Sequence, residues 1–518
     1  MNSRLTVFLL IAAFSFISCQ EKADDPKGPA ILKEEDFKFH VDYFNSMEDE
    51  NIQQAIPNVQ SWEWMEENIP LFECPQQNFQ EIYYYRWWSL RKHIKETPKG
   101  YVMTEFLVDR PYADEYNMIS CALGHHIYES RWLHNPEYLH DYVHVWFRGN
   151  EGGPMAKLRS FSSWTADALY NKFLVDNDRD FLVDMYPDLR KEYFAWEADR
   201  RLPSGLFWQH DVKDGMEESL SGGRRVQNAR PTINSYMYGN AKAMAKIAQM
   251  LDIPEDQTLF NAKADTMKML VEENLWNPES VFFETLTPEG EFAGVREAIG
   301  YIPWYFNLPE NGHEAAWEQV KDKGGFLAPF GLTTAECRHP DFRSHGCCSC
   351  EWDGAIWPFA TSQTMTAMAN VLNDYTQEVV GKNDYFQLFN LYVESQYYRG
   401  RPYIGEYLDE TTGFWLKGDQ ERSRYYNHST FNDMLISGLV GLRPRADYKI
   451  EVNPLIPEDK WDWFCLDNVA YQGDILTIIW DKSGEKYNLG QGLRVLKNGE
   501  EIASSQRLEK ILVEKKTK

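Results

Sequence analysis

The chain contains 518 residues, of which 43% are hydrophobic and 25% charged, a balance that excludes a mostly disordered chain. Its 53 Lys and Arg against 79 Asp and Glu give a net charge of −26, which argues against nucleic acid as a partner because surplus cations bind a phosphate backbone. Aromatic residues make up 15% of the chain, and flat side chains can fill a core or stack on sugar rings.

Residues 1–18 have the pattern of a secretory signal. Arg4 precedes an apolar run over residues 5–17, and Ser18 and Cys19 follow it. This ending resembles a bacterial lipobox, so we expect lipidation at Cys19, with residues 19–75 forming a polar tether and an N-terminal lead-in that packs on the main domain. The pattern predicts a protein of the bacterial cell envelope, in the periplasm or on the outer-membrane surface, that meets the membrane only through its lipid anchor.

Residues 76–445 have helical periodicity. Apolar residues recur at i, i+3, i+4 and i+7 over 119–132, 162–174, 233–251 and 362–372. Long loops rich in Gly, Pro, Trp and charge connect these short helices. This alternation predicts helix hairpins arranged around an axis.

Residues 446–518 have a different pattern. Apolar and polar residues alternate over 448–452, 474–480 and 493–496, and Asn498-Gly499 predicts a turn between two strands. We therefore expect a small C-terminal β domain.

The first motif with chemical content is an acidic loop over residues 211–223. It holds Asp211, Asp214, Glu217 and Glu218 between glycines, just before a predicted helix. Crowded carboxylates repel one another, so one of them can keep its proton near neutral pH, as a general acid must. The alternative is a solvated acidic loop without a catalytic role.

Two further motifs follow along the chain. Residues 352–357 place Asp353 between Trp352 and Trp357, an arrangement suited to binding sugar faces and hydroxyls, or to starting a helix with buried tryptophans. Glu406 lies in an aromatic segment before a predicted turn at 412–413. Only a closed fold brings Glu406 near the acidic loop.

In this order, the three motifs resemble the mannosylglycerate-hydrolase-like catalytic domain of glycoside hydrolase family 63, over roughly residues 70–454. The family's Gly-x-Asp-x-Ser is similar to residues 215–219, with Glu217 in place of the aspartate and Met in place of the preceding aromatic residue. Its Trp-Arg-Gly-Pro-x-Trp is similar to residues 352–357, with Asp353 in place of Arg. Its aromatic-Glu pair before Asp-Pro-x-Thr-Gly is similar to residues 405–413, and residues 427–431 stand where it has Ser-Trp-x-Ala.

The resemblance implies a mainly α protein, an (α/α)6 barrel with a small C-terminal β-sandwich-like domain. It implies an inverting glycosidase, with Glu217 as general acid and Glu406 as general base, and Asp214 and Glu218 remain alternatives for the acid. Inverting pairs stand about 6.5–9.5 Å apart, so that water fits between base and sugar. The expected partner is an oligosaccharide or glycan, with no cofactor or metal; sugar, linkage and oligomeric state stay open. The residues expected to bind the substrate are Asp214, Glu218, Trp352, Asp353, Trp357 and His428.

Cysteines and histidines support other interpretations. Glu336-Cys337 with Cys347, Cys348 and Cys350 resembles the zinc–thiolate site of β-L-arabinofuranosidases, with His339 and His345 as further ligands. A disulfide from Cys337 to one of the three later cysteines, or free thiols, are the alternatives. His125 and Glu129 are four residues apart on a predicted helix, a spacing that allows a metal pair or simply a helix end at the barrel mouth.

Two rival functions complete the set. A non-catalytic glycan-binding lipoprotein predicts that the two acids do not converge on one cavity. A polysaccharide lyase on the same type of barrel predicts reliance on Tyr426 and His428.

Overall fold

The computed structural model describes residues 30–346 and 350–514. Its helices are α1 (Lys38–Ser46), α2 (Ser61–Asn68), α3 (Gln77–Arg91), α4 (Leu123–Ser130), α5 (Glu137–Arg148), α6 (Thr165–Asp176), α7 (Arg179–Arg200), α8 (Asp211–Asp214), α9 (Pro231–Met250), α10 (Pro254–Asn274), α11 (Ile302–Tyr305), α12 (Pro358–Asp374), α13 (Lys382–Ser395) and α14 (Asn432–Met434), with short 3-10 segments between them.

The strands are short in the helical region and longer near the C-terminus. They are β1 (Leu71–Glu73), β2 (Ile94–Thr97), β3 (Gly100–Met103), β4 (Trp208–Gln209), β5 (Asn228–Ala229), β6 (Trp276–Asn277), β7 (Phe282–Phe283), β8 (Leu327–Ala328), β9 (Gly331–Leu332), β10 (Tyr397–Tyr398), β11 (Arg401–Pro402), β12 (Leu442–Arg443), β13 (Ile450–Val452), β14 (Trp463–Tyr471), β15 (Asp474–Asp481), β16 (Gly492–Lys497), β17 (Glu500–Ser505) and β18 (Ile511–Val513).

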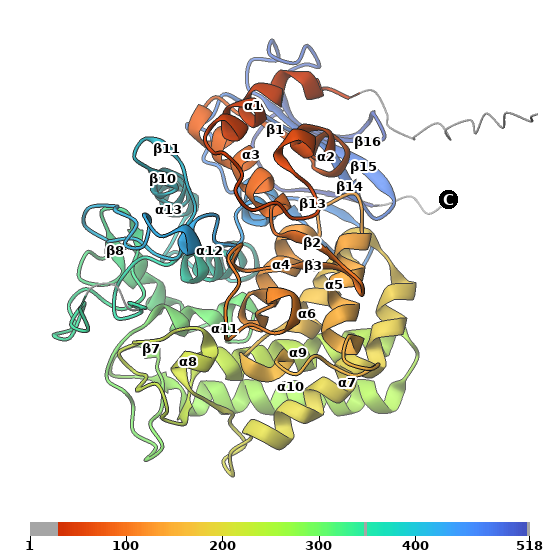
Figure 1. The fold of residues 1–518 in the computed structure, drawn as a ribbon. Helices are drawn as coiled ribbons and strands as arrows, with labels where there is room; N and C mark the ends of the chain where they lie inside the picture. The colour runs from red at the N-terminus through yellow and green to blue at the C-terminus, as the bar shows by residue number, and fades with distance from the viewer. Residues whose placement is uncertain (1–29, 347–349, 515–518) are drawn as a thin grey trace, which may run out of the picture.

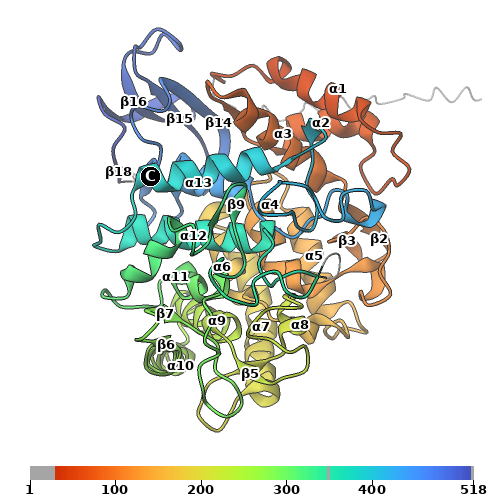
Figure 2. The same cartoon turned by 90° about the vertical axis from the view of Figure 1, so that its left-hand side faces the viewer.

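Six helices form a closed inner ring. In chain order α4, α6, α9, α11, α12 and α14 each contact the next, and α14 contacts α4 again. Helices α3, α5, α7, α10 and α13 alternate with them along the chain, and a 3-10 segment (Glu314–Val320) stands between α11 and α12. Figure 1 shows α9 beside α10, and Figure 2 shows α12 beside α13, each an inner–outer pair. This is the expected (α/α)6 barrel.

Local sequence explains where the inner helices begin. Helices α9 and α12 start at Pro231 and Pro358, and proline suits the first turn because its missing N–H would be unsatisfied there anyway. Almost every residue of α9 is buried, and its many alanines let neighbouring helices approach closely. The helices predicted over 119–132, 162–174, 233–251 and 362–372 are confirmed as α4, α6, α9 and α12, with shifted ends.

The C-terminal strands form two antiparallel sheets, β1-β14-β15-β16-β17 and β12-β13-β18. Asn498 and Gly499 both have positive φ, at 50° and 82°, and join β16 to β17 in the predicted hairpin. The predicted domain limits need two changes. β12 (Leu442–Arg443) already belongs to the β domain, and β1 of the lead-in pairs with β14. In Figures 1 and 2 the N-terminal helices and the C-terminal strands accordingly lie at one end of the molecule.

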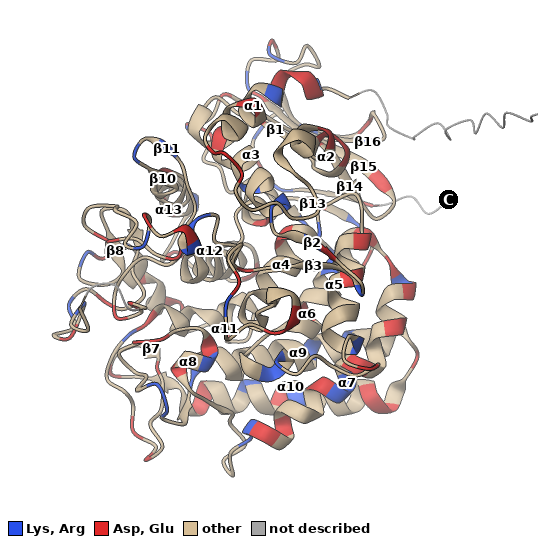
Figure 3. Ribbon diagram, in the orientation of Figure 1, with Lys and Arg blue, Asp and Glu red and all other residues tan. Residues whose placement is uncertain are grey.

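Charged residues are spread over the molecule, with acidic and basic positions interspersed on α7 and α10 (Figure 3). Across residues 30–346 and 350–514, none of the helices combines the length and apolar character that a bilayer crossing requires. The predicted signal and Cys19 lie outside the described residues.

Candidate active site

A cavity of about 560 Å³ opens at the end of the barrel where the inner helices begin. Segments that precede α4, α6, α9, α12 and α14 all contribute to its wall. The lining residues are Glu105, Phe106, Tyr112, Ile119, Cys121, Lys157, Ser160, Phe161, Val212, Lys213, Gly215, Glu217, Arg224, Cys350, Trp357, Phe359, Glu406, Arg422, Tyr426 and His428.

Glu217 lies in this wall, as the acidic-loop motif predicts for the acid. The loop leaves α8 through Gly215, whose φ of 75° favours glycine, and Glu217 is half-buried two residues later. Burial raises the pKa of the Glu217 carboxyl to about 7, and the negative charges of Asp211 and Glu406 act in the same direction. Glu217 is therefore substantially protonated near neutral pH, as a general acid must be.

Glu406 lines the same cavity and is paired with two cations. The Lys417 ammonium lies 2.6 Å from its Oε2, and the Arg422 guanidinium lies 3.0 Å from its Oε1. Opposite charges at these distances stabilise a carboxylate, the form that a general base needs. Glu406 is buried, whereas part of the Glu217 side chain remains exposed.

The other two candidates from the acidic loop do not line this cavity. Asp214 is buried in an ion pair with Arg230 at 2.7 Å and also accepts a hydrogen bond from Thr232. Glu218 pairs with Arg224 and lines a neighbouring pocket. Of the three carboxyl groups considered for the acid, only Glu217 lines this cavity, and substrate contacts of Asp214 and Glu218 stay predictions.

The tryptophan motif is only partly at the site. Trp357 lines the cavity, and it stacks on Trp352 and on Tyr407, each with ring centroids 4.6 Å apart. Trp352 is buried behind it, and Asp353 is buried with Oδ2 accepting a hydrogen bond from the backbone N–H of His345 at 2.9 Å. Trp352 and Asp353 do not line the cavity, so the motif supports Trp357 rather than providing an open sugar platform.

His428 does line the cavity, and its surroundings include a carboxyl group that the sequence motifs do not reveal. Glu105 follows β3 and is buried in the wall. Tyr426 Oη donates a hydrogen bond to Glu105 Oε1, and Cys121 Sγ donates one to Oε2 at 3.2 Å. The pKa of Glu105 is raised to about 8, chiefly by burial, and the negative charges of Glu406 and Glu217 act in the same direction. No recognisable motif surrounds residue 105.

Several aromatic side chains of the cavity wall come from segments that contain no recognisable sequence motif. Phe106, Tyr112 and Phe161 line the cavity, and Phe106 meets Tyr426 edge-on with centroids 4.4 Å apart. Such rings offer apolar surface to the C–H faces of a sugar. The aromatic excess of the composition is the only sequence signal for them.

The contacts of Glu129 do not support a metal site shared with His125. Glu129 accepts backbone hydrogen bonds from Phe431, Asn432 and Asp433 at 2.9–3.0 Å, so its carboxylate caps the start of α14. The residues of the zinc alternative have other partners. Glu336 forms an ion pair with Arg296 at 2.7 Å, and Cys337 and Cys350 carry free thiols. Residues 347–349 of that cluster lie outside the described residues.

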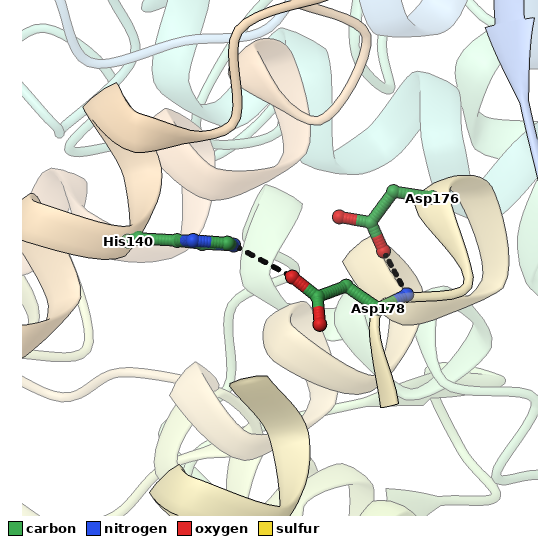
Figure 4. Close-up of side chains that lie close together, drawn as sticks. All are labelled: His140, Asp176 and Asp178. Atoms are coloured by element: carbon green, nitrogen blue, oxygen red, sulfur yellow. Dashed lines mark hydrogen bonds and ion pairs between the residues drawn. The ribbon is translucent and has the colours of Figure 1, made fainter. Parts of the chain in front are cut away.

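One group of possible metal ligands occurs among the described residues, away from the cavity. Figure 4 shows His140, Asp176 and Asp178 close together, with His140 Nε2 3.2 Å from Asp178 Oδ2. The Lys172 ammonium lies 3.0 Å from His140 Nε2 and also contacts Asp176. Because a fixed cation already satisfies these groups, we interpret them as an ion-pair network.

Comparison with known families finds two matches. The model of the mannosylglycerate hydrolase MGH1-like glycoside hydrolase domain matches residues 115–429. The model of the glycosyl hydrolase family 65 C-terminal domain matches residues 442–503. The first match contains the whole cavity except for its Glu105–Tyr112 wall.

Three solved structures illustrate the similarity. A protein named sialidase is 62% identical with a TM-score of 0.93, over 94% of this chain and 45% of that chain, so the present chain spans less than half of that relative. The GH63 mannosylglycerate hydrolase from Thermus thermophilus in complex with glucose matches at 14% identity and TM-score 0.52, over 68% of this chain and 98% of that one. The GH78 rhamnosidase of Bacillus sp. GL1 matches at 12% and 0.58, over 83% and 41%. The last two similarities concern the fold alone.

Proposed function

Because the chain belongs to the mannosylglycerate hydrolase MGH1-like glycoside hydrolase family, we propose that it hydrolyses a glycosidic bond with inversion, using Glu217 as general acid and Glu406 as general base. The observation that carries this proposal is the convergence of the two carboxyl groups on one cavity in contrasting environments. Burial keeps the proton on Glu217, whereas Lys417 and Arg422 pair the charge of Glu406.

The mechanism follows from these two environments. Glu217 donates its proton to the glycosidic oxygen as the bond to the leaving group breaks. Glu406 takes a proton from a water molecule that attacks the anomeric carbon from the opposite face, so the configuration inverts. The aromatic wall holds the sugar and excludes bulk water. The substrate class is an oligosaccharide or glycan.

The rival functions fit the site less well. A glycan-binding protein has no need for two carboxyl groups in such contrasting environments facing one cavity. A lyase that used Tyr426 as its base would need a readily ionised phenol, but burial raises the pKa of Tyr426 well above its usual range. More than half of the sialidase-named relative lies outside the region that this chain matches.

Digestion of a glycan library tests the proposal. Wild-type protein should release reducing sugar from at least one glycan, and Glu217→Gln and Glu406→Gln should each lower the rate by about 10²–10⁴-fold. Glu218→Gln is the matched control, since Glu218 lies next to the proposed acid but outside the cavity. A loss of rate in Glu218→Gln as large as that in Glu217→Gln would show that the assignment of Glu217 as the acid is wrong.

We also propose that the protein resides in the bacterial cell envelope, anchored through a lipid on Cys19 and facing the periplasm or the exterior. The support is the charged, apolar and small-residue order of the first 19 residues. Fractionation of cells that express wild type or Cys19→Ala tests it. The variant should leave the membrane fraction, and its retention there would exclude the anchor.

A further inference from the structure

A second cavity, of about 220 Å³, opens at the end of the barrel opposite to the candidate active site. Its wall comes from the later parts of α4, α9, α11 and α12, from α6, and from the chain after the start of α14. The first cavity is lined instead by segments that precede the inner helices. Within the part of the chain that the structure describes, the two cavities share no lining residue.

Cations outnumber acids in the lining of this second cavity. The cations are Arg131, Lys242, Lys246 and Arg443, and the acids are Asp167 and Asp433. The chain as a whole has the opposite balance, with a net charge of −26. A cavity lined mainly by cations attracts anions and raises their local concentration.

The two arginines already have partners in the protein. Arg131 forms a buried ion pair with Asp433 at 2.8 Å. Arg443 donates a hydrogen bond to Asn370 Oδ1 at 2.9 Å and lies 3.7 Å from Asp374. These contacts shape the wall and leave the two lysines as the cations available to a ligand.

Lys242 and Lys246 lie one turn apart on α9, so both side chains project from the same face of the helix. Among the described residues neither ammonium forms an ion pair, and Lys242 Nζ donates a hydrogen bond only to the Phe306 carbonyl oxygen, at 3.3 Å. Burial lowers the pKa of Lys242; the charge of Asp167 opposes this effect and that of Lys246 adds to it. An anion bound to both ammonium groups would offset their mutual repulsion.

The rest of the wall suits the carbon chain of an organic ligand. Tyr128 and Tyr305 meet edge-on with ring centroids 5.6 Å apart, and Phe306 lies next to Tyr305 with centroids 4.8 Å apart. Such rings offer apolar faces to C–H groups, and the Thr366 hydroxyl adds a polar group to the same lining. The volume lies below the roughly 300–1,000 Å³ of pockets for drug-sized molecules, so the ligand must be small.

We propose that this second cavity binds a small polyol that carries a phosphate or a carboxylate group. Lys242 and Lys246 hold the anionic group, and the aromatic wall contacts the carbon chain. Lys242 is half-buried and Lys246 is exposed, so the anion stays close to water and loses only part of its hydration. This site is separate from the proposed catalytic cavity, and the inference does not depend on the glycosidase function.

Isothermal titration calorimetry with the full chain tests the inference. The probes are glycerol 3-phosphate and glucose 6-phosphate for the phosphate class, and gluconate for the carboxylate class. Glycerol and glucose are the uncharged counterparts, and inorganic phosphate is the anion without a carbon chain. We expect at least one polyol anion to bind with a Kd of about 1 mM or tighter, at least about tenfold more tightly than its uncharged counterpart and than inorganic phosphate.

Variants connect this binding to the second cavity. Lys242→Gln should weaken binding of the polyol anion by about tenfold or more, the effect of losing a charge-assisted hydrogen bond. Lys246→Gln should weaken it by about threefold or more, because water screens the exposed ammonium. Lys323→Gln, at an exposed position outside both cavities, is the control for the change in net charge. Lys213→Gln, which removes a cation from the first cavity, should leave Kd unchanged.

The possible results separate this inference from the proposed function. Absence of binding by every polyol anion, equal binding of the uncharged counterparts or of inorganic phosphate, or an unchanged Kd in Lys242→Gln and Lys246→Gln would each overturn it. Weaker binding in Lys213→Gln alone would place the anion in the first cavity and overturn it as well. Absence of glycan hydrolysis would overturn the proposed function and leave this inference standing. Circular dichroism verifies that each variant is folded, and the exposed Lys246 supplies the test if Lys242→Gln does not fold.

Discussion

The pH dependence of the reaction should move in opposite directions when two neighbours of Glu217 are changed. Asp211 is buried and its negative charge raises the pKa of Glu217, whereas the positive charge of Arg224 lowers it. Asp211→Asn should therefore move the alkaline limb of the kcat/KM profile to lower pH. Arg224→Gln should move the same limb to higher pH.

The size of these effects follows from the environment of Glu217. With a pKa of about 7, roughly half of the Glu217 carboxyls carry a proton at pH 7 and about 1% at pH 9, so kcat/KM should fall about tenfold per pH unit on the alkaline side. Removing the buried charge of Asp211 should move the limb by about 0.3–1 pH unit. Removing the exposed Arg224 should move it by only a few tenths, about 0.2–0.5, because water screens its charge.

Initial rates from pH 4 to 10, in buffers of constant ionic strength, measure both shifts. High salt supplies an internal control, since about 0.5 M NaCl should abolish the Arg224 effect and leave most of the Asp211 effect. The Asn at position 211 keeps an oxygen to accept the Val212 N–H bond, so the loop should stay folded. Two shifts in the same direction, or no shift in either variant, would refute Glu217 as the group that controls the alkaline limb.

Three further predictions concern stability and metal. Lys417→Met leaves the buried Glu406 without the cation 2.6 Å away and should lower the free energy of unfolding by about 3–5 kcal/mol in guanidinium titrations; a loss below about 1 kcal/mol would refute the buried pair. Glu129→Gln turns an amide group toward backbone N–H donors at the start of α14 and should cost about 1–3 kcal/mol, measured in the same way; unchanged stability would argue against the cap. Incubation with EDTA or dipicolinate should leave hydrolysis unchanged, and activity that returned only with zinc would favour the zinc–cysteine alternative.

The barrel could be predicted from the sequence because its signals are local. Periodicity of 3.6 over α9 and α12, alternation over β15, and Asn498-Gly499 each depend on neighbours within a few residues. The limits of the β domain could not, since β1 and β12 are two or three residues long and acquire their meaning only by pairing with β14 and β13. Short strands carry too few residues for a period to appear.

The active site was predictable only as far as motifs reach. Glu217 and Glu406 stand in recognisable patterns, and both line one cavity. The ion pairs of Glu406 with Lys417 and Arg422 cannot be predicted from the sequence. They depend on the conformation of the loop that carries all three residues, and the spacing of the residues along the chain does not reveal that conformation. A motif also does not say which side chains turn inward, as Trp352 behind Trp357 illustrates.

Glu105 shows the limit most clearly. Nothing in residues 104–106 differs from an ordinary strand end, and the partners of Glu105 lie 16 and 321 residues away along the chain. Its hydrogen bonds depend on closure of the barrel, which brings the start of α4 and the segment before α14 together. A residue of this kind is visible only once the tertiary structure is known.

The stereochemistry of the first product tests the central claim most directly. Proton NMR during the first minutes of hydrolysis of a responsive glycan, before mutarotation equilibrates the anomers, identifies the configuration of the released sugar. The account predicts the anomer opposite to that of the substrate, because Glu406 activates water while Glu217 protonates the leaving oxygen. Release of the same anomer as the substrate would mean a covalent intermediate and would contradict the assigned roles.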